Sequence, residues 1–235
     1  VFMGNALQAT EAGYAARLSA LRAGVPEEVP TIAINRQCSS GLEAINMAAQ
    51  LIRTGEVDIV VAGGTENMSQ APFMLGYKAR FDGLKMGDAS LVDGLTDGLG
   101  CPVNRYHMGV TAENVAERFG VSREDQDELA LISHTRATAA IANGRFKGQI
   151  TTVEIPQRRA DPIIADTDEG PRADTTLERL SQLRPVFKKD GTVTAGNASS
   201  INDAAASVVM ISAAKAAELR LKGMLTWHRR GFPRV

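Results

Sequence analysis

The sequence contains few cysteines, little net charge and no long apolar run. Cys38 and Cys101 are its only cysteines in 235 residues, and their spacing is not that of metal ligands. This scarcity excludes a disulfide scaffold and predicts a reducing compartment, the cytoplasm, with no metal site. A formal net charge of -1 provides no field for capturing nucleic acid. No stretch approaches the roughly 20 apolar residues of a membrane span, so no membrane partner is expected.

The apolar start of the chain, residues 1–7, is too short for a secretory signal and has no basic leader. It is typical instead of an internal β-strand that leads into a turn. We therefore expect residues to be missing before Val1. An organellar targeting sequence among those missing residues is not excluded.

Apolar runs and helical patterns alternate along the first part of the chain. Strand-like runs occupy residues 1–4, 31–35 and 58–62, and helix-like runs occupy residues 11–23 and 42–53. Strands that are apolar on both faces and separated by helices predict an α/β fold with a parallel, covered sheet. The polar residues of the second helix form one narrow stripe, so this helix is predicted to be mostly buried.

Cys38 lies between the strand-like run 31–35 and the helix-like run 42–53. At a helix N-terminus, unpaired backbone N–H groups and the helix dipole stabilise negative charge. A thiol there loses its proton closer to neutral pH than its ordinary pKa of ~8.5 allows, and the thiolate is the nucleophile. The alternative is a small buried apolar side chain, as lone cysteines often are. Cys101 has no helix-start context and is interpreted as structural, so Cys38 is expected to be the more reactive thiol.

Four blocks of sequence follow one another in an order that resembles the thiolases. Residues 35–42 read Asn-Arg-Gln-Cys-Ser-Ser-Gly-Leu, like the thiolase nucleophile segment, and residues 60–69 read Val-Val-Ala-Gly-Gly-Thr-Glu-Asn-Met-Ser. Residues 106–114 read Tyr-His-Met-Gly-Val-Thr-Ala-Glu-Asn, and residues 194–203 read Thr-Ala-Gly-Asn-Ala-Ser-Ser-Ile-Asn-Asp. The later blocks most resemble acetyl-CoA acetyltransferases. The first block also occurs in 3-ketoacyl-CoA thiolases, which leaves the acyl chain length open.

The resemblance implies an enzyme that transfers acyl groups between CoA thioesters, either forming acetoacetyl-CoA or cleaving a 3-ketoacyl-CoA by thiolysis. In that chemistry the thiolate of Cys38 attacks a 3-ketoacyl-CoA carbonyl, releases an acetyl-CoA enolate and becomes an acyl-cysteine, which CoA then attacks. The backbone N–H of Cys38 would help to stabilise the tetrahedral oxyanion. Ser39 and Ser40 are expected to leave room for substrate and to cap N–H groups of the first helical turn. CoA is a substrate here, and no permanently bound cofactor is implied.

The same resemblance implies four residues that bind CoA and substrate. His107 and Met108 would line the channel for the pantetheine arm, with His107 packing or hydrogen bonding rather than transferring a proton. Ser199 would contact the pantetheine amides. Arg172 would lie near the CoA nucleotide, where a guanidinium suits phosphate, although an exposed arginine on a polar loop is usually only solvated. The expected partners are acyl-CoA and CoA, and the complete protein is expected to be a homo-oligomer, a dimer or a tetramer.

Local signals indicate where some elements start and stop. Residues 122–125 (Ser-Arg-Glu-Asp) predict a capping box that opens a helix, and residues 143–144 (Asn-Gly) predict its end. The pair Gly63-Gly64 lacks the Gly-x-x-x-x-Gly-Lys pattern of a phosphate loop. Residues 65–69 are predicted to form the turn after the strand and to make subunit contacts near the nucleophile.

The family pattern divides the chain into four parts. Residues 1–69 correspond to the thiolase N-terminal core without its opening βαβ unit, residues 70–193 to an inserted α+β loop domain that covers the CoA site, residues 194–219 to a return to the core sheet, and residues 220–235 to a divergent tail. The expected fold class is therefore α/β, a thiolase-like layered α-β-α sheet that is incomplete. The chain contains no Gly-His-Pro segment, whose histidine activates the thiolase nucleophile, and no Cys-x-Gly segment, whose cysteine is the acid/base toward substrate. We therefore expect a fragment that is inactive alone.

Two other functions stay open. A non-catalytic acyl-CoA-binding or lipid-transfer module of thiolase ancestry would use the residues that line the CoA channel, but it would have no need of an activated thiol. A decarboxylating enzyme similar to the ketoacyl synthases would share the nucleophile, but the blocks at 106–114 and 194–203 disfavour it. The intact nucleophile segment favours the acyltransferase.

Overall fold

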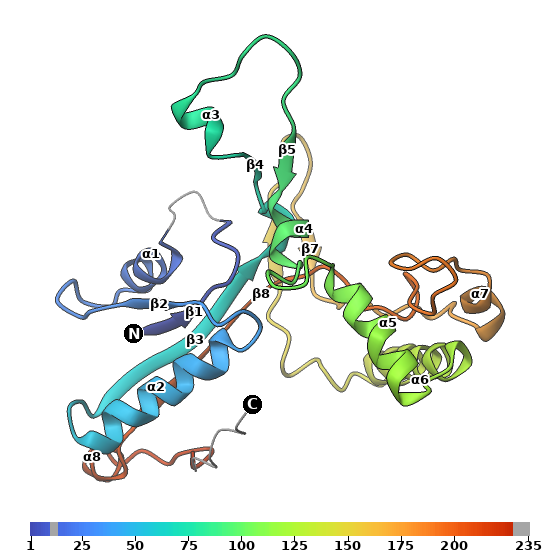
Figure 1. The fold of residues 1–235 in the computed structure, drawn as a ribbon. Coiled ribbons are helices and arrows are strands. Elements are labelled where there is room, and N and C mark those ends of the chain that lie inside the picture. Colours follow the sequence, from blue (N-terminus) through green and yellow to red (C-terminus); the bar gives the residue numbers. More distant parts are fainter. Residues whose placement is uncertain (10–13, 228–235) are drawn as a thin grey trace. The chain divides into compact units, whose positions relative to one another are not determined.

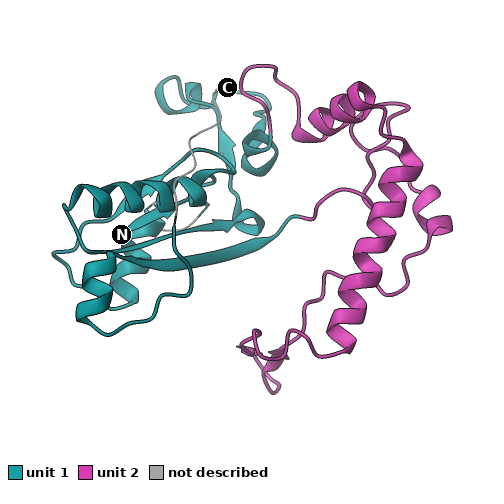
Figure 2. Ribbon diagram, turned by 90° about the horizontal axis from the view of Figure 1, so that it is seen from below, with its two compact units in different colours: residues 1–99, 201–235 teal, residues 100–200 magenta. Residues whose placement is uncertain are grey.

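A computed structural model describes residues 1–9 and 14–227, which divide into two compact units (Figures 1 and 2). One unit holds residues 1–99 and 201–235, and the other holds residues 100–200. The first unit contains β1 (Phe2–Gly4), α1 (Ala15–Arg22), β2 (Ile32–Ile34), α2 (Ser40–Thr54), β3 (Ile59–Asn67), the 3₁₀ helix η1 (Met68–Gln70), β4 (Phe73–Leu75), α3 (Lys78–Phe81), β5 (Leu91–Asp93), α4 (Gly94–Gly98), β8 (Asp203–Ile211) and α8 (Ala213–Glu218). The second unit contains α5 (Met108–Phe119), α6 (Arg123–Ala142), β6 (Val153–Ile155), β7 (Ile163–Ala165) and α7 (Leu177–Ser181).

The first unit is built on a four-stranded sheet with the strand order β2-β1-β3-β8. β1 pairs in parallel with both β2 and β3, as the alternating pattern predicts. β8 pairs with β3 in the antiparallel direction, a direction that the alternating pattern of residues 1–69 did not address. The reason is the connection: the chain leaves β3 at Asn67 and re-enters the sheet at Asp203, directly opposite, so β8 must run back along β3.

Serine and aspartate side chains close the β3–β8 pair at both ends. Beyond the end of β3, Ser69 donates hydrogen bonds from its N–H (3.0 Å) and its hydroxyl (2.5 Å) to Asp203. At the other end, the Ser212 hydroxyl donates to Asp58 over 2.7 Å. The Ser69 hydroxyl, followed by the Ser69 N–H, lowers the pKa of Asp203 below its ordinary value. These contacts fix the register of the long antiparallel ladder.

Helices α1 and α2 lie on opposite faces of the sheet (Figure 1). β2 and β3 lie on opposite sides of β1, and right-handed crossovers in opposite directions place their helices on opposite faces. The buried cluster consists of Phe2, Val60 and Ala62 of the sheet with Ala44 and Ala48 of α2. The predicted layered α-β-α class is therefore confirmed.

The prediction that the second helix is mostly buried is wrong. In α2 the buried apolar side chains are small, at Ala44, Ala48 and Ala49. Leu42 is 55% exposed, and the larger apolar residues Ile45, Met47, Leu51 and Ile52 are only partly covered. The sequence pattern showed that most of the helix circumference is apolar and could be buried. The described residues bury only the side that faces the sheet.

The second unit contains the helix that the capping box predicts. The Ser122 hydroxyl accepts a hydrogen bond from Asp125 N (3.0 Å), and the Asp125 carboxylate accepts one from Ser122 N (3.0 Å). The hydroxyl of Ser122 donates to the same carboxylate, and these bonds lower the pKa of Asp125. The helix ends at Ala142, and Gly144 adopts a φ of 65°, so both predicted ends are confirmed.

One further expectation differs from the structure in detail. Residues 65–67 continue β3 rather than forming a turn, because they pair with residues 203–205 of β8, and the chain turns only at η1. The divergent tail has neither helix nor strand from residue 220 to 227, and the rest of the tail, from His228 on, lies outside the described residues. Among the helices of the described residues, none has the length and apolar character needed to cross a membrane. The four-part division into domains stays a prediction.

The exposed strand β8 predicts self-association of the isolated chain. β8 is an edge strand, and Val209 in it is 68% exposed. An open apolar edge is a template for pairing with another chain, and full burial of a valine stabilises an assembly by about 1.5 kcal/mol or more. Light scattering of the purified chain should therefore show species larger than a monomer. Val209→Lys should shift the distribution toward monomer, whereas Val115→Lys on helix α5, at a valine that is 48% exposed, should not. A monodisperse monomer with a sharp cooperative melt would contradict this prediction.

Candidate active site

Cys38 is exposed and lies in the tight loop between β2 and α2, just before Ser39, the N-cap of α2. The loop contains Gln37 with a φ of 53°, a left-handed conformation that is uncommon for a residue other than glycine. Because Gly4 on β1 has no side chain, the start of α2 can pack closely against the sheet. A Cβ on Gly4 would lie only 2.6 Å from Gly41 N. Cys38 is therefore held beside the sheet at the N-terminus of a long helix.

The expectation that the two serine hydroxyls cap the first turn is wrong. Ser39 makes no side-chain capping bond. The Ser40 hydroxyl instead accepts from Arg36 N (2.8 Å) and donates to Gln37 O (2.5 Å). The N–H groups of Ser39 and Ser40 are already bonded to the carbonyls of Arg36 and Gln37, so the hydroxyl of Ser40 serves to close the loop. This fixes the backbone on both sides of Cys38.

Cys38 lines a cavity of about 420 Å³ within the first unit. The segment that leaves β1 forms one side of this cavity through Asn5, Ala6 and Leu7. Glu66 of β3 and residues 204–206 of β8 also line it. The walls are mostly apolar, so the cavity suits a short acyl group beside the exposed thiol.

His107 is placed at the start of α5 by two contacts. As the N-cap residue, its Nδ1 accepts a hydrogen bond from Gly109 N over 3.0 Å. Its ring stacks on Phe187, with centroids 4.8 Å apart and an interplanar angle of 12°. Gly109 is required here because a Cβ would collide with the Phe187 ring. Met108, the first residue of α5, is 41% exposed and adjacent to this pair.

Arg172 and Ser199 lie on other loops of the second unit. The backbone N–H of Arg172 donates to Nδ1 of His134 on α6 over 3.1 Å, and the arginine side chain is exposed. Ser199 is exposed in the segment that leads to β8. The structure thus brings His107 and Met108 together, places Arg172 and Ser199 on separate loops of the same unit, and places Cys38 in the other unit.

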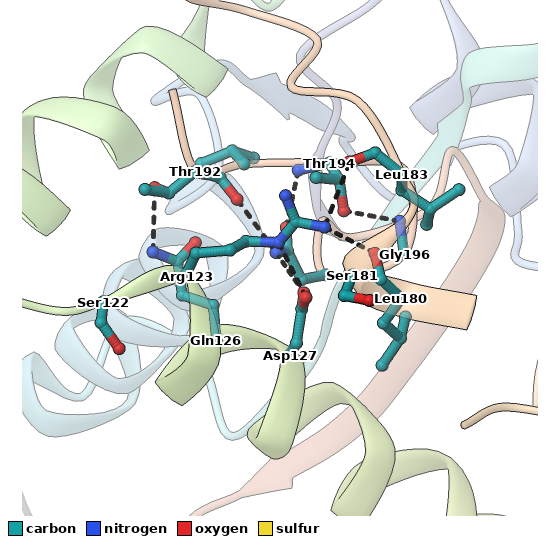
Figure 3. Close-up of polar contacts among 12 residues, drawn as sticks. Ser122, Arg123, Gln126, Asp127, Leu180, Ser181, Leu183, Thr192, Thr194 and Gly196 are labelled. Atoms are coloured by element: carbon teal, nitrogen blue, oxygen red, sulfur yellow. Dashed lines mark hydrogen bonds and ion pairs between the residues drawn. The ribbon is translucent and has the colours of Figure 1, made fainter. Parts of the chain in front are cut away.

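A polar network secures the segment that precedes Ser199 (Figure 3). The buried Asp127 pairs with Arg123 at 2.7 Å and accepts from the Asn197 amide at 2.9 Å. Asn197 also donates to Thr192 O (3.1 Å) and accepts from Thr194 N (2.7 Å). Arg123 donates further to the carbonyls of Leu180 and Leu183. Helix α6 is therefore tied to the segment directly before Ser199.

Glu113, which is only 3% exposed, anchors a second part of this loop to α5. Its carboxylate accepts hydrogen bonds from Thr192 N (2.8 Å), Val193 N (2.8 Å) and the Thr192 hydroxyl (3.0 Å). Burial alone would raise the pKa of Glu113, but the N–H groups of Val193 and Thr192, the hydroxyl and the charge of Lys188 together lower it. Sequence reasoning missed Glu113 and Phe187, although Glu113 lies inside the third block.

Replacing Glu113 by glutamine is expected to lower the free energy of unfolding by about 1–3 kcal/mol, because an amide presents N–H groups to donors that need an acceptor. The pKa of Glu113 in the folded chain lies below the ordinary 4.5. The ionised carboxylate therefore contributes its full share of the folding stability above pH 4.5, and this share is lost as the pH falls through the folded pKa. Denaturant melts at several pH values should show the difference between Glu113→Gln and wild type shrinking with acidification. Glu128→Gln, at an exposed position on α6, is the control. Equal stability of the two variants would contradict this role.

Cys101 has surroundings that the sequence did not indicate. The backbone N–H of Asn104 approaches its sulfur at 3.3 Å. This N–H, followed by that of Val103, lowers the pKa of Cys101 below its ordinary value. Cys101 therefore also has an environment that favours its thiolate, so labelling experiments must resolve the two thiols separately, and the greater reactivity of Cys38 stays a prediction. In the described part of the chain, no group of three or more His, Cys, Asp or Glu side chains could hold a metal ion.

Comparisons with known proteins match nearly the whole chain. The family described as "Thiolase, N-terminal domain" matches residues 1–214. A probable acetyl-CoA acyltransferase of Staphylococcus aureus is 52% identical over 94% of this chain and 56% of its own length, and an acetyl-CoA acetyltransferase of Pseudomonas aeruginosa is 51% identical with the same coverage. The chain thus spans about half the length of the curated relatives it matches.

Solved structures show the same likeness. A Bacillus anthracis acetyl-CoA acetyltransferase aligns with a TM-score of 0.84 at 42% identity, covering 94% of this chain and 55% of that one. A human mitochondrial 3-ketoacyl-CoA thiolase in complex with CoA aligns with a TM-score of 0.85 at 41% identity, again covering 94% and 55%. The fold of the described residues is therefore that of half of these enzymes.

Proposed function

Because the chain belongs to the thiolase family, we propose that it carries the nucleophile of an acyltransferase that moves acyl groups between CoA thioesters. The proposal is supported above all by the position of Cys38, exposed at the N-terminus of α2 and lining an apolar cavity. A pure binding module has no need of a thiol in this place. The acyl group is proposed to be carried by Cys38 as a thioester.

The proposed first half-reaction consumes acetoacetyl-CoA or a longer 3-ketoacyl-CoA. The Cys38 thiolate forms a bond to the 3-keto carbon, and the bond between that carbon and the 2-carbon breaks. The electron pair leaves on acetyl-CoA as an enolate, which takes up a proton. In the second half-reaction, the thiol of CoA gives up its proton to solvent and its sulfur bonds to the acyl carbon. The bond between that carbon and the Cys38 sulfur breaks, which releases acyl-CoA and regenerates the Cys38 thiolate. The backbone N–H of Cys38 is the proposed donor to the oxyanion.

The proposed CoA site lies on the second unit. His107, with its ring fixed by Phe187, and Met108 would line the pantetheine channel, Ser199 would contact the pantetheine amides, and Arg172 would lie near the nucleotide. The CoA complex of a structural relative supports CoA as the ligand. A homo-oligomer, dimer or tetramer, and a cytoplasmic location remain part of the proposal.

A single-turnover experiment tests the function. The purified chain is mixed with acetoacetyl-CoA in the absence of free CoA, and acetyl-CoA is quantified by chromatography over time. The proposal predicts a slow release that stops near one equivalent per chain, because each thiolate is acylated once. If acetoacetyl-CoA binds but no acetyl-CoA is released, the proposal is wrong and the chain is a binding module.

A further inference from the structure

Glu66 accepts hydrogen bonds from residues 5–7, the segment that forms one wall of the Cys38 cavity. One carboxylate oxygen accepts hydrogen bonds from the Asn5 side-chain amide (3.2 Å) and from Leu7 N (2.9 Å), and the other accepts from Ala6 N (2.9 Å). The three donors are N–H groups, and a carboxylate offers acceptors only. Asn5 is buried and donates also to Thr65 O (3.0 Å), so the wall is bonded to β3 at two neighbouring residues.

Asn35 joins the same wall to the loop of the nucleophile. Its amide donates to Ala6 O over 3.2 Å, and its side-chain oxygen accepts from Gln37 N over 3.0 Å. A continuous hydrogen-bonded route therefore leads from Glu66 through Ala6 and Asn35 to Gln37, the residue before Cys38. Gln37 is also the residue held at a φ of 53°, a conformation that persists only when neighbouring contacts impose it.

We propose that Glu66 is a positioning residue for Cys38. Its carboxylate holds the wall of residues 5–7 and, through Asn35, the left-handed conformation of Gln37, which sets where the thiolate meets the acyl carbonyl. The N–H donors already engage both oxygens, so the role of Glu66 is to orient and not to transfer a proton. This inference rests on the proposed function of Cys38.

The test compares Glu66→Gln with Glu28→Gln, the same change at an exposed glutamate of the same unit. Amide hydrogen exchange is followed at residues 6, 7 and 37. The maximal rate and the half-saturating concentration of acetoacetyl-CoA are measured for Cys38 acylation, together with the rate of Cys38 alkylation by iodoacetamide. Glu66→Gln should speed exchange at all three amides and lower the maximal acylation rate about tenfold, because small misplacements of reacting groups are costly. Half-saturation and alkylation should stay within about twofold of wild type, since binding and thiol exposure are retained.

Other outcomes are equally decisive. Faster exchange confined to residues 6 and 7, with wild-type acylation, would overturn the inference and leave Glu66 a structural residue only. If wild-type Cys38 is never acylated, the proposed function fails, and exchange at Gln37 alone decides whether Glu66 positions the loop. Asn35→Ala keeps the hydrogen bonds of Glu66 but removes those of Asn35 to Ala6 and Gln37. It should therefore slow acylation and speed amide exchange at Gln37, while amide exchange at Leu7 stays unchanged. If Asn35→Ala leaves the exchange rate of the Gln37 amide unchanged, the hydrogen-bonded route from Glu66 to Gln37 is contradicted. This result decides the question even if Glu66→Gln does not fold.

Discussion

Replacing Cys38 by alanine is expected to abolish the release of acetyl-CoA from acetoacetyl-CoA, leaving only the rate in buffer. The variant removes the one atom that is proposed to form the bond to the acyl carbon. Losing an enzyme nucleophile lowers turnover by factors of up to ~10⁶, far more than the loss of any supporting contact. The measurement is the single-turnover assay with equal concentrations of wild type and variant.

Cys101→Ala is the matched control for this prediction, because it removes the other thiol, whose pKa is lowered by hydrogen bonds from backbone N–H groups. It should release acetyl-CoA at a rate within about twofold of wild type, as expected for a group outside the reaction. The opposite pattern, with loss of release in Cys101→Ala and none in Cys38→Ala, would contradict the assignment of the nucleophile.

The 235-residue chain alone is expected to show no sustained turnover with acetoacetyl-CoA and CoA. Its sequence holds no Gly-His-Pro and no Cys-x-Gly segment, and each positioned acid or base contributes roughly 10²–10⁴ to a rate. Losing both groups should lower the steady-state rate by about 10⁴ or more relative to a full-length relative assayed in parallel. A continuous assay of acetoacetyl-CoA loss with excess CoA measures it.

Many turnovers per chain that disappear in Cys38→Ala would contradict this expectation. Such a result would mean that another described group takes over the acid and base roles. His107 would be the first candidate to replace, since His107→Ala would then abolish turnover, whereas a role in lining the CoA channel predicts weaker binding of CoA.

Much of the sheet could be predicted from the sequence because its pattern is local. The apolar runs at 1–4 and 31–35 contain within a few residues the signals for strands. The direction of β8 could not be read in this way, because it depends on where the chain returns to the sheet after more than a hundred residues. The capping box at Ser122 was predictable for the opposite reason, since every partner lies within one turn.

In the candidate site, too, features set by local sequence could be predicted and features set by distant contacts could not. The position of Cys38 before α2 follows from the strand and helix patterns that flank it. Glu66 lies in a block that the family resemblance singles out, but its contacts with residues 5–7 span about sixty positions and have no local signature. The lowered pKa of Cys101 likewise depends on the turn at 101–106, where Arg105 has a φ of 60°.

Peptide mapping of the chain after reaction with acetoacetyl-CoA tests the central claim most directly. The protein is quenched in acid, digested, and analysed by tandem mass spectrometry for acetyl thioesters, with the peptides of Cys38 and Cys101 quantified separately. We predict an acetyl group on Cys38 in an amount equal to the acetyl-CoA released, and little on Cys101. Acetylation confined to Cys101, or release of acetyl-CoA without any acetyl-cysteine, would contradict the assignment of Cys38 as the acyl carrier.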